Sequence, residues 1–242
     1  MKNKRYVPDL AVLFFLLTLI LALCSWVGSI YGAGEVQSLL SVEGIRWTLG
    51  HIMDNYVQAP ALGIVLVLLM GGGIVVQSGL YDVLKRLCRK EGKLSRKERR
   101  ALALALVTFF IYGSLIGLCL ALPSNILLGV TGSWLYSPLV EGSAYLLAIG
   151  MGLSGLVYGY VADVFRVMRD WIEGMTILIA RKASYFVTLF FVVQFFSSLV
   201  YTRLLEYLHL SEGFVEVLFQ VCCYLPLCFG RKNESHTRAY KQ

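Results

Sequence analysis

Few side chains at membrane depth could do chemistry in this sequence. Gln77 and Gln194 are amides inside long apolar stretches. A glutamine in such a place either hydrogen-bonds to a neighbouring helix or contacts a polar solute. Three consecutive glycines precede Gln77, and they predict either a close helix crossing or a broken helix that forms a binding site. The candidates for a solute path are Gly71, Gly72, Gly73, Gln77, Ser78 and Gln194.

Two further pairs of glycines have the spacing of a helix-packing motif. Gly113 and Gly117 form one pair, and Gly155 and Gly159 form the other. Glycines four residues apart lie on one face of a helix and let a second backbone approach closely. The spacing does not say whether the second helix belongs to the same chain or to another copy. We expect a homo-oligomer, at least a dimer, or a complex with a partner membrane subunit.

Patterns typical of enzymes are missing from the sequence. It has no HExxH motif, no paired aspartates and no Ser/His or Cys/His arrangement. The three histidines lie outside the apolar stretches, and the six cysteines have neither zinc spacing nor the pattern of a disulfide framework. We therefore predict that the chain is not an enzyme and has no catalytic residue, no cofactor and no metal site.

The composition determines which elements must position the candidate residues. Of the 242 residues 57% are apolar and only 15% are charged, whereas soluble domains are about 45–50% apolar and about 25% charged. So much apolar surface requires the bilayer as a second solvent. The prediction is an all-α fold, a polytopic bundle of membrane helices forming a single integral membrane domain over residues 1–242.

Six apolar segments are the predicted transmembrane helices, and amphipathic segments join them. A segment over 32–58 precedes the second span and is expected to lie in the outer interface plane. The segment 81–100 is expected to be a basic loop, and 163–182 is a mixed-charge amphipathic segment on the same side. The predicted spans are 9–31, 59–80, 101–122, 140–162, 183–202 and 214–229.

The positive charge of the chain follows membrane topology. With the amino terminus inside and six spans, 20 of the 22 Lys and Arg residues fall in cytoplasmic segments, leaving only Arg46 and Arg203 outside. The net charge of +7 is thus explained without nucleic acid, which we exclude as a partner. The expected partner is the lipid bilayer. Both termini are expected in the cytoplasm of a bacterial-type inner (plasma) membrane.

Two stretches of the sequence together resemble one transporter family. The first carries Glu43-Gly44-Ile45, Trp47, Asn55, Pro60, Leu62-Gly63 and Ser78-Gly79-Leu80. The second carries Leu94-Ser95, Leu156-Val157-Tyr158-Gly159, Arg169-Asp170, Gly174-Met175 and Gln194-Phe195. In order and spacing these residues resemble the AbgT family, which is named for uptake of p-aminobenzoyl-glutamate and includes drug-efflux members. The likeness covers most of residues 25–200.

The resemblance implies a shortened member of that family. It implies secondary transport of p-aminobenzoyl-glutamate-like aromatic anions or antimetabolites. The family's two re-entrant hairpins, which line its substrate path, have no counterpart in the matched stretches, so no family substrate residue carries over. Two functions therefore stay open: a transporter, or a non-transporting scaffold, regulatory or partner subunit that keeps the family's dimerising helices.

Overall fold

The computed structural model describes residues 10–31, 36–89, 94–121, 137–207 and 211–228. Within these ranges all regular secondary structure is helical. Five helical segments are long and apolar enough to cross a membrane. The predicted all-α membrane-helix architecture is therefore confirmed. The helices belong to two compact units, one made of residues 1–62 with 182–242 and the other of residues 63–181.

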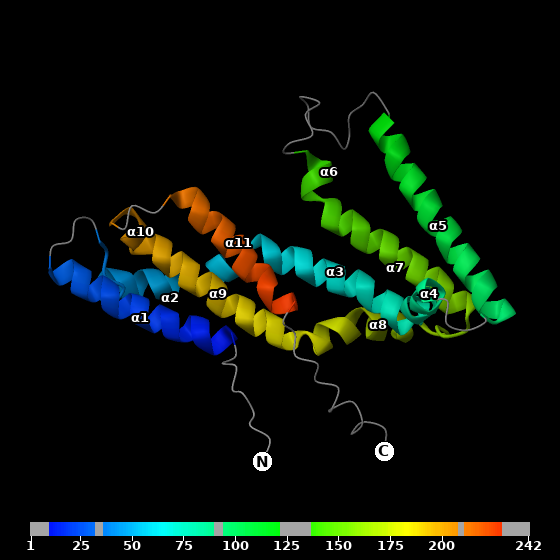
Figure 1. Ribbon diagram of the computed structural model, residues 1–242, viewed down its shortest axis with the longest axis horizontal. Helices are drawn as coiled ribbons and strands as arrows, with labels where there is room; N and C mark the ends of the chain where they lie inside the picture. Colours follow the sequence, from blue (N-terminus) through cyan, green and yellow to red (C-terminus); the bar gives the residue numbers. More distant parts are fainter. Residues whose placement is uncertain (1–9, 32–35, 90–93, 122–136, 208–210, 229–242) are drawn as a thin grey trace, which may run out of the picture. The chain divides into compact units, whose positions relative to one another are not determined.

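The first unit combines helices from both ends of the sequence (Figure 1). Helices α1 and α9 of this unit lie side by side. The Phe14 ring of α1 contacts two rings of α9, with its centroid 5.6 Å from that of Phe195 and 6.3 Å from that of Phe196. α11 packs on the same helix α9 through Phe196 and Phe219, whose centroids are 5.3 Å apart. Its elements are α1 (Leu10–Ile30), α2 (Val42–Val57), the first turn of α3, α9 (Ala183–Tyr201), α10 (Leu204–Tyr207) and α11 (Glu212–Cys228).

The amphipathic helix α2 begins where the sequence provides a cap. The Ser41 hydroxyl accepts a hydrogen bond from the Gly44 backbone N–H at 3.0 Å, which satisfies one donor of the first turn. One face of α2 packs on α9 through Trp47 and Tyr201, with centroids 4.2 Å apart. The other face exposes a stripe of large apolar side chains, which suits a helix that lies against lipid. These exposed residues are Val42, Ile45, Leu49, Met53 and Val57.

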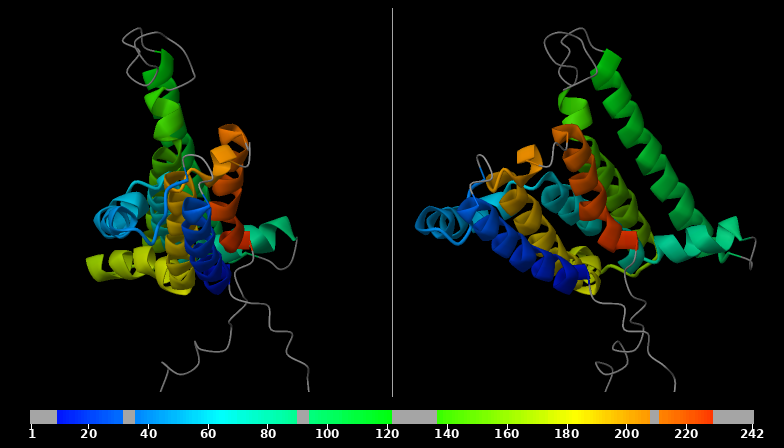
Figure 2. Two further views of the ribbon diagram at one scale, coloured as in Figure 1. Left: turned by 90° about the vertical axis from the view of Figure 1, so that its left-hand side faces the viewer. Right: turned by 60° about the vertical axis from the view of Figure 1, so that its left-hand side comes forward.

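The second unit is one continuous stretch of chain. α5 and α7 pack side by side, and the short α4 packs on both of them (Figures 1 and 2). Leu80 and Val83 of α4 are buried against Ala101 and Ala105 of α5 and against Tyr158 of α7. The elements are the remainder of α3 (Pro60–Gln77), α4 (Leu80–Cys88), α5 (Arg96–Ala121), α6 (Pro138–Glu141), α7 (Ser143–Val161) and α8 (Met168–Arg181).

The predicted spans match helices whose ends differ from the prediction by a few residues. α1, α3, α5, α7 and α9 correspond to the first five spans. The sixth corresponds to α11, an apolar helix of 17 residues that is shorter than the five long ones, so its crossing stays a prediction. The single domain over 1–242 likewise stays a prediction beside the two units.

One expectation about local structure is wrong. The basic segment 81–100, expected as a loop, contains α4 and the first turn of α5. α4 is stabilised by burial of Leu80 and Val83, and at the start of α5 the Glu98 carboxylate accepts a hydrogen bond from the Ser95 backbone N–H at 2.8 Å, which is one of the two bonds of a capping box. Of the two possibilities for the glycine triplet, the structure has no break in the helix, because α3 runs without interruption through all three residues.

Candidate functional site

The three glycines of α3 are places of close backbone approach. A Cβ added at Gly71 would overlap the carbonyl oxygen of Ala148 in α7, and one added at Gly73 would overlap the carbonyl oxygen of Gly174 in α8. At Gly72 a Cβ would meet only the Leu178 side chain, at an ordinary 3.4 Å. The first and third glycines therefore permit α3 to cross two neighbouring helices, which is the packing role of small residues in membrane helices.

Gln77 and Ser78 lie at the turn between α3 and α4. The Ser78 side chain is fully buried and serves the backbone, because its hydroxyl donates to the Val75 carbonyl at 3.1 Å and accepts from the Leu80 N–H at 3.4 Å. Gly79 follows with φ of +84°, a conformation that favours glycine. The half-buried Gln77 amide has no hydrogen-bond partner within the described ranges, so it is the candidate best placed to meet a polar group from outside this chain.

Gln194, in contrast, has a structural partner. Its Nε2 donates to the Ile52 carbonyl of α2 at 2.7 Å. One turn of α2 further on, the Tyr56 hydroxyl donates to the Phe186 carbonyl of α9 at 3.1 Å. These two bonds connect side chain to backbone across residues 142 and 130 positions apart. Of the two possibilities for the Gln194 amide, a bond to a neighbouring helix is therefore present and fastens the amphipathic helix to α9, whereas a contact with a solute stays a prediction.

The two glycine pairs have different surroundings. A Cβ at Gly155 would come within 3.0 Å of the Ile74 side chain of α3, and one at Gly159 would overlap the Phe165 ring. This pair therefore packs inside the chain. Around Gly113 and Gly117 no described atom apart from the neighbouring residues and the local backbone of α5 lies within 4 Å of an added Cβ. Only the pair in α5 keeps the open face that a second copy would need.

A cavity that the sequence did not predict lies in the first unit. It has a volume of about 690 Å³ and lies among α2, α9, α10 and α11. Its wall includes Trp47, Tyr201, Phe196 and Phe219, together with charged side chains from the chain after α9. Ligand pockets are typically about 300–1,000 Å³ and mostly apolar with a few polar groups, and this cavity fits that description.

The polar part of this cavity contains two unusual residues. Arg203 adopts a left-handed backbone conformation with φ of +53° directly after α9, a position where glycine is the usual residue. Asn55 lines the cavity, and its buried Nδ2 has no partner among the described atoms. Trp47 and Asn55 are eight residues apart in α2, about two helical turns, so they share a face. The sequence analysis named both residues for the family resemblance and did not connect them with a cavity.

Charged residues at one end of the second unit join three elements. Arg86 of α4 donates to the Glu98 carboxylate of α5 at 2.7 Å, and this bond raises the pKa of the Arg86 guanidinium. Lys97 of α5 pairs with Asp163, which directly follows α7 in a left-handed conformation with φ of +59°. The hydrogen bond and charge of Lys97 lower the pKa of the Asp163 carboxyl. Both ion pairs are solvent-exposed, so they help to orient the three elements but contribute little to the free energy of unfolding.

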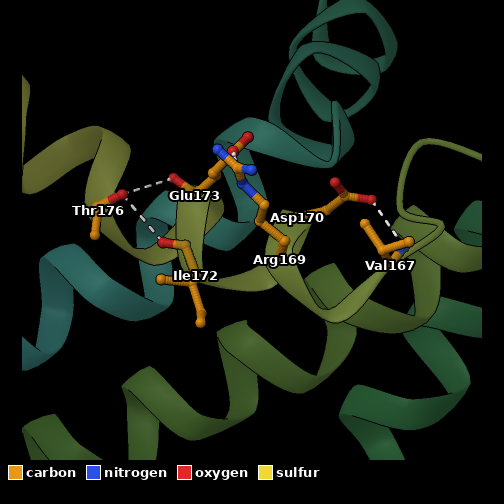
Figure 3. A network of polar contacts seen from close by, with 6 residues as sticks. All are labelled: Val167, Arg169, Asp170, Ile172, Glu173 and Thr176. Atoms are coloured by element: carbon orange, nitrogen blue, oxygen red, sulfur yellow. Dashed lines mark hydrogen bonds and ion pairs between the residues drawn. The ribbon is translucent and has the colours of Figure 1, made fainter.

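α8 has its own polar network, drawn in Figure 3. The Asp170 carboxylate accepts hydrogen bonds from the backbone N–H groups of Arg166 at 2.7 Å and Val167 at 3.0 Å, and these bonds lower the pKa of Asp170. Arg169 pairs with Glu173 one turn later at 3.0 Å. The network caps the amino-terminal end of α8. Within the described ranges no group of His, Cys, Asp and Glu side chains could hold a metal ion.

Sequence comparison gives the family of the chain. The family described as "AbgT putative transporter family" matches residues 2–93 and 84–214, and the two matched stretches meet in and just after α4. The p-aminobenzoyl-glutamate transport protein of Escherichia coli K12 is 31% identical over 88 residues. That match covers 32% of this chain and 17% of the relative.

Two solved structures have a similar fold. The YdaH transporter of Alcanivorax borkumensis matches with a TM-score of 0.69 at 18% identity, over 81% of this chain and 71% of that one. MtrF of Neisseria gonorrhoeae, described with a class of antimetabolite efflux pumps, matches with a TM-score of 0.75 at 16% identity, over 92% and 80%. The family match spans most of the sequence, and the helical fold agrees with it. The chain belongs to the AbgT transporter family.

Proposed function

We propose that this chain is a membrane-embedded scaffold subunit in the transport of p-aminobenzoyl-glutamate-like aromatic anions, and that it does not carry the solute alone. The observation that supports this is the use of Gln194. Moving a charged solute requires polar groups at membrane depth, whereas the Gln194 amide is bonded to the Ile52 carbonyl. Gly71 and Gly73 likewise lie at helix crossings. Among the polar candidates, Gln77 is therefore the one expected to contact a partner subunit.

The expected assembly is a complex in a bacterial inner membrane, with both termini in the cytoplasm. The charge distribution of the sequence supports the orientation. Reporter fusions after residue 242 and within residues 32–58 test it, and an external carboxyl terminus would contradict it. The open face at Gly113 and Gly117 supports a dimer. Gly113→Leu should reduce the mass measured by light scattering in mild detergent, while the matched Gly63→Leu should not.

The purified chain in liposomes tests the scaffold role. We expect no accumulation of p-aminobenzoyl-glutamate above that of empty vesicles under a sodium or proton gradient. Uptake by the chain alone that disappears in Gln77→Leu would refute the proposal. Gln77→Leu is preferred to a change at Gln194, because loss of the Gln194 bond would also loosen α2.

The second candidate function is transport by this chain itself, favoured by the aromatic cavity of the first unit. An aromatic ring could pack on Phe196 and Phe219 while its carboxylate meets Arg203. Trp47→Ala separates the candidates. If the chain transports alone through this cavity, the variant loses uptake. If it is a scaffold, neither protein transports, and the variant loses only stability.

A further inference from the structure

We infer that the second unit binds one anionic phospholipid, with an acyl chain in an apolar cavity between α4, α5 and α7 and the phosphate against the basic residues beside it. The inference does not depend on the proposed function, because it concerns a different cavity and a lipid rather than a solute. Three observations on the same elements carry it.

The first observation is a cavity with an almost wholly apolar wall. It has a volume of about 260 Å³ and is lined from α4 by Leu84, from α5 by Leu102, Leu106 and Phe109, and from α7 by Met151. Leu102 and Phe109 are seven residues apart, so the wall extends roughly 10 Å along α5 at 1.5 Å per residue. An apolar slot of this length suits part of a hydrocarbon chain and offers little to a polar solute.

The second observation is the position of α4. This helix lies between two candidate spans, since α3 ends at Gln77 and α5 begins at Arg96. α4 therefore lies near a membrane surface. It exposes Tyr81, Leu84 and Leu87 among charged residues, the pattern of a helix that lies in the interface and contacts both acyl chains and headgroups.

The third observation is an excess of positive charge beside the cavity. Two bases of this region, Arg86 and Lys97, are held in ion pairs. The other described bases of α4 and the first turns of α5 have no acidic partner within the described ranges, although Asp82 lies in the first turn of α4. They are Lys85, Arg89, Arg96, Arg99 and Arg100.

Arg99 connects the charge to the cavity. It precedes Leu102 by three residues and Leu106 by seven, so all three lie on one face of α5. The basic end of this face is at the membrane surface and its apolar end lines the cavity. A molecule with a phosphate joined to a hydrocarbon chain meets both requirements at once. Each Lys or Arg near an anionic surface contributes about 1 kcal/mol, or about fivefold in affinity.

The test uses the full chain purified in mild detergent and titrated with phosphatidylglycerol, with phosphatidylcholine and inorganic phosphate as separate arms. Thermal unfolding and native mass spectrometry report binding. We expect phosphatidylglycerol alone to raise the unfolding midpoint and to remain bound in the mass spectrum. Equal stabilisation by phosphatidylcholine would overturn the charge argument. Equal stabilisation by inorganic phosphate would overturn the role of the cavity.

Three variants locate the site. Arg99→Gln should weaken phosphatidylglycerol binding about fivefold, and Leu84→Trp, which fills the cavity from its exposed side, should abolish it. Arg181→Gln removes the same charge from the last turn of α8, away from this cavity, and should bind as the wild type does. A loss in Arg181→Gln equal to that in Arg99→Gln would show diffuse attraction and overturn the site. Because Arg99 is exposed, its variant remains informative if Leu84→Trp does not fold.

Discussion

The crossing of α3 over α7 provides the sharpest quantitative test of the fold. In Gly71→Ala the new Cβ would overlap the carbonyl oxygen of Ala148 and lie 2.9 Å from its Cα and 3.0 Å from its carbonyl carbon. All three atoms are backbone, so no side chain can turn away. The two helices must separate, and inserting a methyl group into a packed interior typically costs about 1–3 kcal/mol.

A matched variant isolates that cost. Gly72 also lies inside α3, but its added Cβ would meet only the Leu178 side chain, at an ordinary 3.4 Å. Both substitutions gain the same helix propensity, about 1 kcal/mol, and this gain cancels when the variants are compared. Gly71→Ala should therefore be less stable than Gly72→Ala by about 1–3 kcal/mol. At about 2–4 °C per kcal/mol for a chain of this size, the unfolding midpoints should differ by roughly 2–12 °C.

The assay is thermal unfolding in one detergent at one protein concentration, followed by far-ultraviolet circular dichroism. Gly73→Ala provides a second measurement at the crossing with α8 and should behave as Gly71→Ala does. If Gly71→Ala is as stable as Gly72→Ala, the close approach of α3 to α7 is wrong. The glycine triplet would then have no packing role at this crossing.

Three other variants test separate features. Gln194→Leu should lower the free energy of unfolding by about 1 kcal/mol, because the Ile52 carbonyl loses its side-chain donor. Proteases should then cut α2 more readily, and unchanged digestion of α2 would contradict the anchoring role. Arg203→Gly should raise the unfolding midpoint by a few degrees, because glycine removes the strain of roughly 1–2 kcal/mol that a left-handed backbone conformation costs other residues. A lower midpoint would show that the Arg203 side chain stabilises the fold by more than this strain costs. The pKa of Asp170 is lowered in the fold, so its contribution is present above the unfolded pKa of about 3.9 and is lost as pH falls through the folded value. Hydrogen exchange at the Val167 amide, corrected for intrinsic rates, should therefore quicken below about pH 4 in the wild type and be fast at neutral pH in Asp170→Ala, which has no acceptor, and equal protection in both proteins at neutral pH would refute the cap.

The sequence predicted the long helices well and the uses of individual polar residues poorly. Runs of apolar residues report burial in lipid directly, so the five long apolar helices α1, α3, α5, α7 and α9 could be located within a few residues. For Gln194 the sequence offered a bond to a neighbouring helix as one of two possibilities, but it could not name the partner, because that partner is a backbone carbonyl 142 residues away. α4 was missed because its charged residues lie in a longer basic run. Its helix depends on burial of Val83 against α5 and α7.

The glycines could likewise be recognised from the sequence, but the contacts of each one could not. The sequence identified all of them as close-packing candidates, yet only contacts separate Gly155, which meets Ile74, from Gly113, which meets no described atom. The aromatic cavity was hidden for a similar reason. Its walls come from four helices, and no pattern in the sequence shows that Trp47 and Asn55 of α2 meet side chains of α9, α10 and α11.

The composition of the first unit has a consequence for biogenesis. α1 and α2 leave the ribosome long before α9, the helix on which both of them pack. The second unit, in contrast, is one uninterrupted stretch that is complete before α9 is made. During synthesis α1 and α2 must therefore wait in the membrane without their partner while the later unit assembles. Premature release of the chain before α9 would leave Phe14 and Phe15 of α1 without the phenylalanines of α9 on which they pack.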